Sequence, residues 1–309
     1  MREKGDNVLE LKGLIAASFT PLKKDGSLNL KEIPKIVDDQ LKNGIKGFYV
    51  LGSTGEGFSL TVEDRKRVAE AYVEAVDCRV PVVVQVGHNS IDESVALAKH
   101  AGGIADAISS NAPSYFKVSD IDLLIECMFK ITDAAPDVPF YYYHIPFLTG
   151  ADLDMVEFLR KASRKIPSLR GIKFSENDLK KYKECKDYNE GEFDIVWGID
   201  ELLLDALESG AKGAVGSTYN MMPRLYHKII KNYEQKNMEG AKSHMKLAES
   251  IIDVFLDKYA PLHPSLKSTM RSLGYEVGYH KLPLPPTIAE VDGNIRKNLE
   301  ELDFYNWSI

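Results

Sequence analysis

Short apolar runs alternate with longer amphipathic segments along the first two thirds of the chain. Between the runs lie segments such as Val62–Val76 and Ile91–Ala101, in which apolar residues recur at spacings of three and four, as on one face of a helix. The runs themselves are rich in β-branched and aromatic residues and have the length of strands. They are Gly13–Thr20, Gly47–Gly52, Val80–Gly87, Ala105–Ala112, Val138–Pro146, Leu169–Ser175, Asp194–Gly198 and Lys212–Ser217. This alternation predicts βαβ units and a parallel sheet.

Eight strands in this order predict a closed (β/α)₈ TIM barrel. An open, doubly wound sheet would give the same alternation, but the motifs GxGxxG and GxxxxGK[ST] that usually accompany it do not occur. After Asn220 the strand pattern stops, and the segment Ile229–Tyr259 has a helical pattern. We therefore expect a barrel over residues 1–222 and a C-terminal helical extension over residues 223–309, packed on the barrel without a linker.

Size and charge restrict the kinds of partner that the protein is expected to bind. The 309 residues, 44% of them apolar, can build one large barrel or two ordinary domains. Lys and Arg total 39 against 46 Asp and Glu, so a net charge of −7 gives no general attraction to nucleic acid or to an anionic membrane. No apolar stretch has the length of a membrane span, and the start of the chain lacks the apolar region of a signal peptide. We expect a small-molecule ligand, bound by local groups.

Cysteines and histidines also restrict the chemistry. Cys78, Cys127 and Cys185 are odd in number and far apart, which favours a reducing, cytoplasmic location over a disulfide framework. The 7 histidines form no HxH or HExxH cluster, so the sequence predicts no tight zinc site and no metal-dependent reaction.

The second run ends in GSTGE, residues 52–56, where two hydroxyl residues lie between glycines. Ser53 and Thr54 can offer backbone N–H and side-chain O–H groups to an anion such as a carboxylate. The same residues can also form an ordinary capped turn between a strand and a helix, and the segment alone leaves both interpretations open.

Lys173 is a lone ammonium in the sixth run, LRGIKFS. Strand alternation places it on one face with Leu169 and Gly171, and we expect this face to line the barrel interior. Apolar surroundings disfavour a charged amine, and a neutral amine can attack a ketone. A structural lysine that pairs with a core carboxylate, or whose stem reaches outward to water, is the alternative.

The fifth run, FYYYHIP, places Tyr141 and Tyr143 on one face, from which a phenol could reach Lys173 and exchange protons with a substrate. Packing in an aromatic core explains the same tyrosines equally well. His144 alternates to the opposite face and is expected to be structural. In the seventh run, Asp200 and Glu201 of WGIDE could accept hydrogen bonds from a polyol, or could simply favour the start of a helix.

Taken together and in this order, GSTGE, YYYHIP, GIKFS, WGIDE and GAVGSTYN make the chain resemble the N-acetylneuraminate lyase and dihydrodipicolinate synthase superfamily over nearly its whole length. The resemblance implies a barrel with C-terminal helices, a homotetramer, and pyruvate bound as a Schiff base without a cofactor.

The same resemblance implies a role for each matching residue. Lys173 would form the Schiff base, Tyr143 would be the acid and base, and Ser53 and Thr54 would hold the pyruvyl carboxylate. Tyr115 in NAPSYFK would complete the site of a neighbouring subunit. The sugar portion of a substrate would be met by Ser175, Gly198, Asp200, Glu201, Gly216 and Ser217.

Position 148 separates two branches of the superfamily. Synthases carry an arginine there that binds a substrate carboxylate, and Leu148 cannot do so. The resemblance therefore implies a lyase that reversibly cleaves N-acetylneuraminate to pyruvate and N-acetylmannosamine, although Phe147 stands where the lyase pattern usually has a small residue. The alternatives are another pyruvate-dependent aldolase, hydratase or synthase acting on a keto-deoxy sugar acid, and a non-catalytic sugar-binding barrel.

Overall fold

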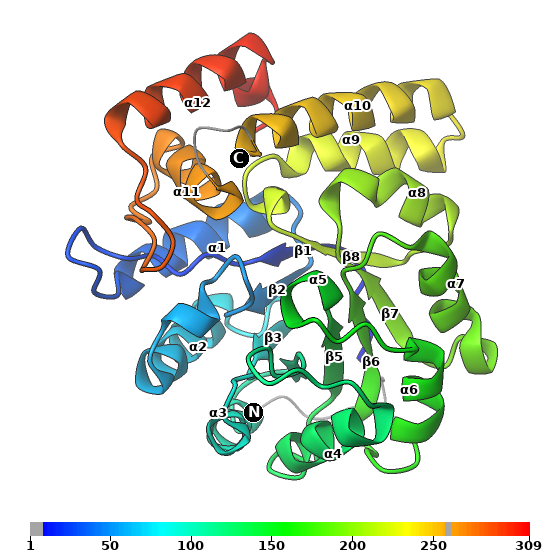
Figure 1. Ribbon diagram of the computed structural model, residues 1–309. Coiled ribbons are helices and arrows are strands. Elements are labelled where there is room, and N and C mark those ends of the chain that lie inside the picture. Colours follow the sequence, from blue (N-terminus) through cyan, green and yellow to red (C-terminus); the bar gives the residue numbers. More distant parts are fainter. Residues whose placement is uncertain (1–8, 257–260) are drawn as a thin grey trace.

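Eight parallel strands close into a barrel in the computed structural model, which describes residues 9–256 and 261–309 (Figure 1). The strands are β1 Gly13–Ala17, β2 Gly47–Val50, β3 Val82–Gln85, β4 Ala107–Ser110, β5 Phe140–His144, β6 Leu169–Phe174, β7 Asp194–Trp197 and β8 Gly213–Gly216. Each strand pairs with the next along the chain, and β8 pairs with β1. All eight predicted runs are confirmed as strands, and each strand is shorter than its run because the ends of the run belong to turns.

Helices follow the strands and cover the outside of the barrel, except for the short α5, which lies at the end of the barrel (Figure 1). They are α1 Ile33–Lys42, α2 Val62–Val76, α3 Ile91–Gly102, α4 Ile121–Thr132, α5 Pro146–Thr149, α6 Met155–Ala162, α7 Leu179–Asp187 and α8 Leu203–Glu208. Several begin at a side-chain cap, for example Thr61, which accepts a hydrogen bond from the Asp64 backbone N–H. The helices predicted over 62–76 and 91–101 are both confirmed, and the second extends to Gly102.

Buried apolar side chains form two layers. The outer layer fills the space between the strands and the helices, and it continues under the C-terminal helices. The inner layer lies inside the barrel and consists of Leu11, Ile15, Ala17, Tyr49, Val83, Ala107, Tyr141, Tyr143, Ile145, Val196 and Val215. The prediction that Tyr141 and Tyr143 share one face, directed to the interior, is confirmed.

The alternation in β6 is interrupted once. Phe140 of β5 is paired with Leu169, but its neighbour Tyr141 is paired with Gly171, so the register skips Arg170. Leu169 consequently packs in the outer layer, and the prediction that it shares a face with Lys173 is wrong. Beyond the irregularity the alternation resumes, and Lys173 faces the interior opposite Tyr143.

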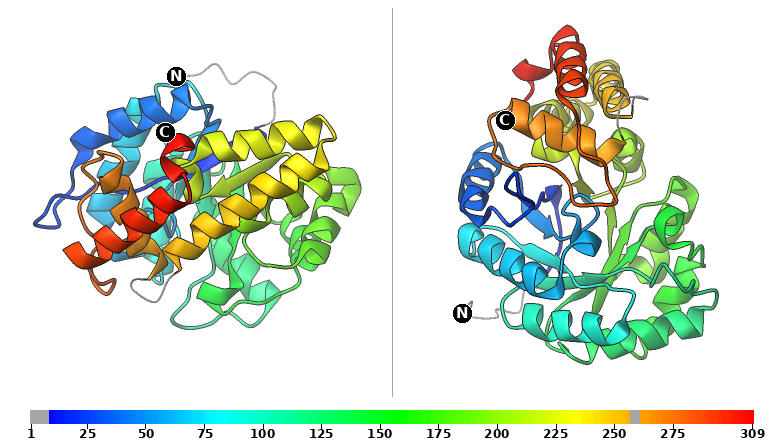
Figure 2. Two further views of the ribbon diagram at one scale, coloured as in Figure 1. Left: turned by 90° about the horizontal axis from the view of Figure 1, so that it is seen from above. Right: turned by 60° about the vertical axis from the view of Figure 1, so that its left-hand side comes forward.

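The C-terminal helices gather on one side of the barrel, coloured yellow to red in Figures 1 and 2. They are α9 Pro223–Glu234, α10 Met238–Phe255, α11 Leu262–Ser272 and α12 Ala289–Glu301. The segment predicted as helical over 229–259 is divided between α9 and α10, and its last three residues lie outside the described part of the chain. Packing of these helices on the barrel is confirmed, and the domain boundary at residue 222 stays a prediction.

Six short 3-10 turns complete the secondary structure of the described residues: η1 Leu30–Glu32, η2 Gly57–Ser59, η3 Tyr188–Gly191, η4 Asp200–Leu202, η5 Thr218–Asn220 and η6 Phe304–Asn306. Within residues 9–256 and 261–309, no helix combines the length and the apolar character that crossing a membrane would require.

Candidate active site

The predicted site residues lie at one end of the barrel, where the strands finish. Tyr143 and Lys173 are the second-last residues of β5 and β6, and Gly216 is the last residue of β8. The other positions come after β2, β6, β7 and β8, except for Tyr115, which comes after β4. The short helix α5, which follows β5, lies near the centre of the view in Figure 1 and marks this end. In (β/α)₈ barrels this is the end that carries ligand sites.

Lys173 lies between two aromatic rings. Its Nζ is 4.0 Å from the ring centroid of Tyr143 and 4.2 Å from that of Tyr49, and the residue is 5% exposed. The two rings meet edge to face, with their centroids 5.6 Å apart. No residue in the described ranges forms an ion pair or a hydrogen bond with Lys173, so the structure gives no support to the alternative of a paired structural lysine.

Tyr49 was missed by sequence reasoning, although alternation along β2 could have placed it inside the barrel. Its hydroxyl donates a hydrogen bond to Ser109 Oγ at 2.8 Å, and Ser109 Oγ in turn donates to the Tyr141 carbonyl at 2.7 Å. Burial, followed by the nearby Tyr143, raises the pKa of Tyr49 well above its ordinary value. Tyr49 therefore presents a ring face to Lys173 while its proton is engaged elsewhere. The Tyr143 hydroxyl has no hydrogen-bond partner in the described chain.

The turn after β2 holds its two hydroxyl residues in different surroundings. Thr54 is buried, and its Oγ1 lies 2.6 Å from Ser217 Oγ in the turn after β8. Ser53 is partly exposed, and its carbonyl accepts the Glu56 N–H at 3.0 Å. Thr20 Oγ1 donates to the Gly55 carbonyl at 2.6 Å. The barrel thus brings Thr54 and Ser217, predicted from motifs far apart in the sequence, to one place.

Asp200 is buried beside the turn that follows β8. Its Oδ2 accepts hydrogen bonds from the backbone N–H of Thr218 at 2.8 Å and from Thr218 Oγ1 at 2.6 Å. Burial raises the pKa of Asp200 to about 6, while the hydrogen bonds from Thr218 oppose this rise. Asp200 is also the first residue of η4, as the alternative interpretation has it, and its hydrogen bonds join this turn to the one after β8. Glu201 is exposed at the same end.

Two glycines leave room for these polar groups. A Cβ atom on Gly198 would lie 2.0 Å from Ser175 Oγ, which donates to the Gly198 carbonyl at 3.1 Å. A Cβ atom on Gly216 would lie 2.3 Å from Asp200 Oδ1. Any larger residue at either position would displace Ser175 or Asp200, two of the side chains predicted to meet the substrate.

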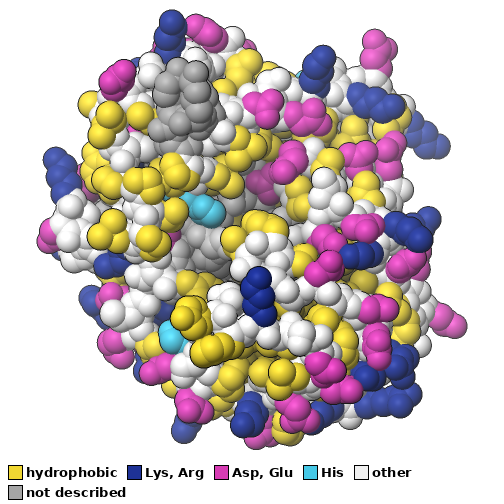
Figure 3. Space-filling model, in the orientation of Figure 1, with side chains coloured by type: hydrophobic (Ala, Val, Ile, Leu, Met, Phe, Trp, Pro, Cys, Tyr) yellow, Lys and Arg dark blue, Asp and Glu magenta, His cyan; other side chains and the backbone are white. Residues whose placement is uncertain are grey.

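Tyr115 is not part of this arrangement in a single chain. It is 78% exposed, its ring lies edge to face against that of Phe116 at 5.0 Å, and its backbone N–H donates to Asn89 Oδ1 at 3.1 Å. Phe147 and Leu148 of α5 are 76% and 53% exposed, and Figure 3 shows hydrophobic side chains over α5 near the centre of this face.

His144 lies outside the barrel interior, as predicted. Its Nε2 is 2.8 Å from Glu176 Oε2, and its ring packs against Phe174. Burial lowers the pKa of His144, although the carboxylate of Glu176 acts in the opposite direction. Among the described residues, no group of three His, Cys, Asp or Glu side chains is arranged to hold a metal ion.

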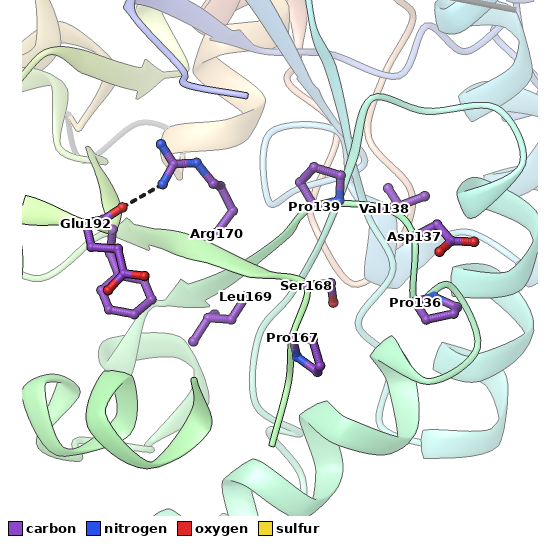
Figure 4. Close-up of a pocket in the computed structure, with 10 residues that line it drawn as sticks. Pro136, Asp137, Val138, Pro139, Pro167, Ser168, Leu169, Arg170 and Glu192 are labelled. Atoms are coloured by element: carbon purple, nitrogen blue, oxygen red, sulfur yellow. Dashed lines mark hydrogen bonds between the residues drawn. The ribbon is translucent and has the colours of Figure 1, made fainter. Parts of the chain in front are cut away.

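A hollow of about 590 Å³ lies at the opposite end of the barrel (Figure 4). Its lining comes from the segments that lead into β5, β6 and β7, including Pro139 and Leu169, and Arg170 donates to the Glu192 carbonyl there at 2.7 Å. None of the predicted site residues lines it, so the candidate site and this hollow are at different ends.

Fold and site together define a class: (β/α)₈ barrels that carry a lysine on the sixth strand, buried at the carboxyl end of the sheet. Residues 10–302 match the model of the Dihydrodipicolinate synthetase family, and the chain belongs to this family.

Individual relatives agree with this assignment. The chain is 38% identical to human N-acetylneuraminate lyase over 304 residues. The aligned region covers 97% of this chain and 95% of the human protein. The solved structure of Proteus mirabilis N-acetylneuraminate lyase superposes with a TM-score of 0.93 at 36% identity, covering 96% of this chain and all of that one. A Ruminococcus gnavus sialic acid aldolase, solved as its catalytic lysine mutant, has a TM-score of 0.89 at 28% identity, covering 96% of this chain and 97% of that one.

Proposed function

We propose that the protein is a class I aldolase that reversibly cleaves N-acetylneuraminate to pyruvate and N-acetylmannosamine, through a Schiff base on Lys173. The observation that carries the proposal is the position of Lys173 Nζ, 4.0 Å from the Tyr143 ring centroid and without an ion-pair partner among the described residues. The relatives described above bear the name of this activity.

The first step forms the covalent bond. Uncharged Lys173 attacks the C2 ketone of the open-chain sugar acid, one proton is taken up from the solvent, water leaves, and a protonated imine remains. Ser53 and Thr54 hold the C1 carboxylate at the turn after β2, where Thr54 Oγ1 already lies 2.6 Å from Ser217 Oγ. The rings of Tyr143 and Tyr49 hold Lys173 Nζ at this end of the barrel, 4.0 and 4.2 Å from their centroids.

The second step breaks the carbon–carbon bond. The proton of the C4 hydroxyl passes through the Tyr143 hydroxyl to the substrate carboxylate, the C3–C4 electron pair moves to the iminium, and N-acetylmannosamine leaves. The enamine is then protonated at C3, and water hydrolyses the imine to release pyruvate and regenerate Lys173. Because the iminium nitrogen is the electron sink, this mechanism calls on no cofactor or metal, and activity is expected to survive EDTA.

The remaining polar groups of this end bind the sugar portion. Asp200 is oriented by two hydrogen bonds from Thr218 and can accept hydrogen bonds from hydroxyls of the substrate. The other proposed contacts are Ser175, Gly198, Glu201, Gly216 and Ser217. A side chain at position 216 would collide with Asp200, which supports the proposal that the substrate meets the bare backbone of Gly216.

We further propose a cytoplasmic homotetramer in which Tyr115 completes a neighbouring subunit's site. Support comes from the exposure of Tyr115 and Phe116, at 78% and 82%, on the surface of the single chain. Sedimentation analysis of the parent and of Tyr115→Ala tests this, together with turnover. Loss of turnover in an intact oligomer supports the shared site, and a parent that is monomeric at working concentration contradicts it.

The decisive experiment follows pyruvate release from N-acetylneuraminate, coupled to lactate dehydrogenase, in the parent and in Lys173→Ala. Release by the parent alone supports both the reaction and the nucleophile. In parallel, borohydride is added with pyruvate and the modified peptide is identified by mass. A pyruvate adduct on Lys173 without release from N-acetylneuraminate would move the substrate to another keto-deoxy sugar acid. Absence of both would indicate a non-catalytic barrel.

A further inference from the structure

A buried ion pair joins the turn after β2 to the C-terminal helices. Lys267 Nζ of α11 donates to Glu56 Oε1 at 2.5 Å, across a sequence separation of 211 residues. The two side chains are 0% and 1% exposed. Glu56 is the last residue of the GSTGE motif and lies two positions after Thr54. The proposed mechanism uses neither charge.

Both carboxylate oxygens of Glu56 are held by the extension. Oε2 accepts the backbone N–H of Lys281 at 2.9 Å, and the ammonium of Lys267 also donates to the Tyr279 carbonyl at 3.2 Å. The third nearby group, His280, has its Nε2 3.6 Å from Glu56 Oε1. Burial, and then the charge of Lys267, lower the pKa of His280 to about 2. Burial also lowers the pKa of Lys267, and the charge of Glu56 acts in the opposite direction.

The backbone of the turn depends on where Glu56 is held. Glu56 has a φ of 54°, in the left-handed region that a side chain rarely adopts without external support. Its N–H donates to the Ser53 carbonyl at 3.0 Å, and the Gly57 N–H donates to the Gly52 carbonyl at 3.2 Å. Fixing the Glu56 carboxylate therefore fixes the loop that carries Ser53 and Thr54.

We infer that the Glu56–Lys267 pair positions the Ser53–Thr54 turn for the substrate carboxylate, so that the C-terminal extension sets the affinity of the barrel for pyruvate. Glu56 and Lys267 are positioning residues, since neither touches the reacting atoms. The inference rests on the proposed function, because it requires a carboxylate to be bound at this turn.

An ion pair is suited to this task more than to stability. Two buried charges gain little over well-packed apolar groups, but they fix a geometry, and removal of one partner leaves the other charge uncompensated. Small displacements at a reactive site are costly, since a shift of about 1 Å can change a rate by roughly 10²-fold. A purely structural pair would be replaceable by neutral groups without any effect on ligand affinity.

The test is borohydride trapping of pyruvate at graded concentrations in the full-length protein, which gives the pyruvate concentration for half-maximal adduct. Three variants address the pair: Glu56→Asp, which keeps the charge but shortens the side chain, Lys267→Arg, which keeps charge and reach, and the double variant Glu56→Gln/Lys267→Met, which leaves no unpaired charge. Thermal unfolding is measured for each. The control is Arg296→Met, which removes another ion pair of the extension, that of Arg296 with Glu300 on α12 at 2.9 Å.

We expect half-saturation to rise at least about tenfold in Glu56→Asp and in the double variant, and to stay near the parent value in Lys267→Arg and Arg296→Met. An increase that does not follow the unfolding temperature supports positioning. Parent-like half-saturation in Glu56→Asp, or in a folded double variant, overturns the inference. A parent protein that gives no pyruvate adduct refutes the proposed function itself, which is a different result from parent-like trapping in the variants.

Discussion

Two buried ionisable side chains at opposite ends of the barrel, Asp194 and Lys173, have opposite surroundings. At the amino end, Asp194 accepts hydrogen bonds from the Tyr141 hydroxyl at 2.7 Å and from the Leu11 backbone N–H at 2.8 Å. At the carboxyl end, Lys173 lies against Tyr143 and Tyr49 and has no ion-pair or hydrogen-bond partner within the described residues. Asp194 is matched by two hydrogen-bond donors, whereas Lys173 is left available as a nucleophile although Asp200 and Thr218 at the same end are matched to each other.

This difference separates stability from chemistry. Matched polar groups keep a barrel end closed, whereas an unmatched ammonium costs free energy in the folded state and is retained where a reaction needs it. Substitutions at the two ends should therefore have opposite signatures: lost activity with unchanged or improved stability at the carboxyl end, and lost stability with unchanged activity at the amino end.

The largest effect is expected for Lys173→Met, which should abolish pyruvate release and the borohydride adduct. Because the variant replaces a buried amine that lacks a hydrogen-bond partner among the described residues by an apolar side chain of similar length, the free energy of unfolding should rise by about 1 kcal/mol. Urea denaturation and the coupled assay measure the two quantities. A marked loss of stability in this variant would show that the lysine is structural and would remove the contrast between the ends.

Tyr143→Phe should lower kcat by roughly 10²–10⁴-fold, because the ring remains but the proton carrier is lost. Pyruvate should still be trapped on Lys173. Tyr49→Phe is the matched control, since the Tyr49 hydroxyl is bonded to Ser109 and only its ring faces the lysine. Equal losses in the two variants would show that the rings, and not the Tyr143 hydroxyl, carry the effect.

The pH dependence of stability should report Asp200. Its pKa of about 6 in the folded protein lies above the ordinary 3.8, so the folded state binds this proton more tightly than the unfolded chain does. The resulting stabilisation is fully present below pH 4 and is lost as the pH rises through 6, a change of about 3 kcal/mol. Asp200→Asn should remove this component in urea denaturation at a series of pH values. If the free energy of unfolding depended on pH in the same way in the variant and the parent, Asp200 would not be the titrating group.

The smallest effect belongs to the amino end. Tyr141→Phe removes one donor to the buried Asp194 and should lower the free energy of unfolding by about 1.5 kcal/mol. Turnover and pyruvate trapping should equal those of the parent. A kcat that falls together with stability would show that the two ends are coupled through the interior of the barrel.

Sequence patterns predicted the strands and the face of Lys173 and Tyr143 because these depend on local alternation. The same rule failed for Leu169, since the register irregularity between β5 and β6 depends on the pairing of two strands and leaves no mark in either one alone. The ion pair between Glu56 and Lys267 could not be predicted from the sequence either, because a contact between residues 211 positions apart depends on the completed fold.

The sequence separation between Glu56 and Lys267 also determines the order in which the two residues are synthesised. Glu56 leaves the ribosome long before Lys267, and at roughly 5–20 residues per second the 211 intervening positions take about 10–40 s to translate. Throughout this interval a nascent barrel can pair its strands from β1 onward, but its turn at Glu56 carries a carboxylate whose partner has not been made. We therefore expect the newborn chain to gain its ligand affinity in one late step, when α11 docks, and not gradually as each strand is added.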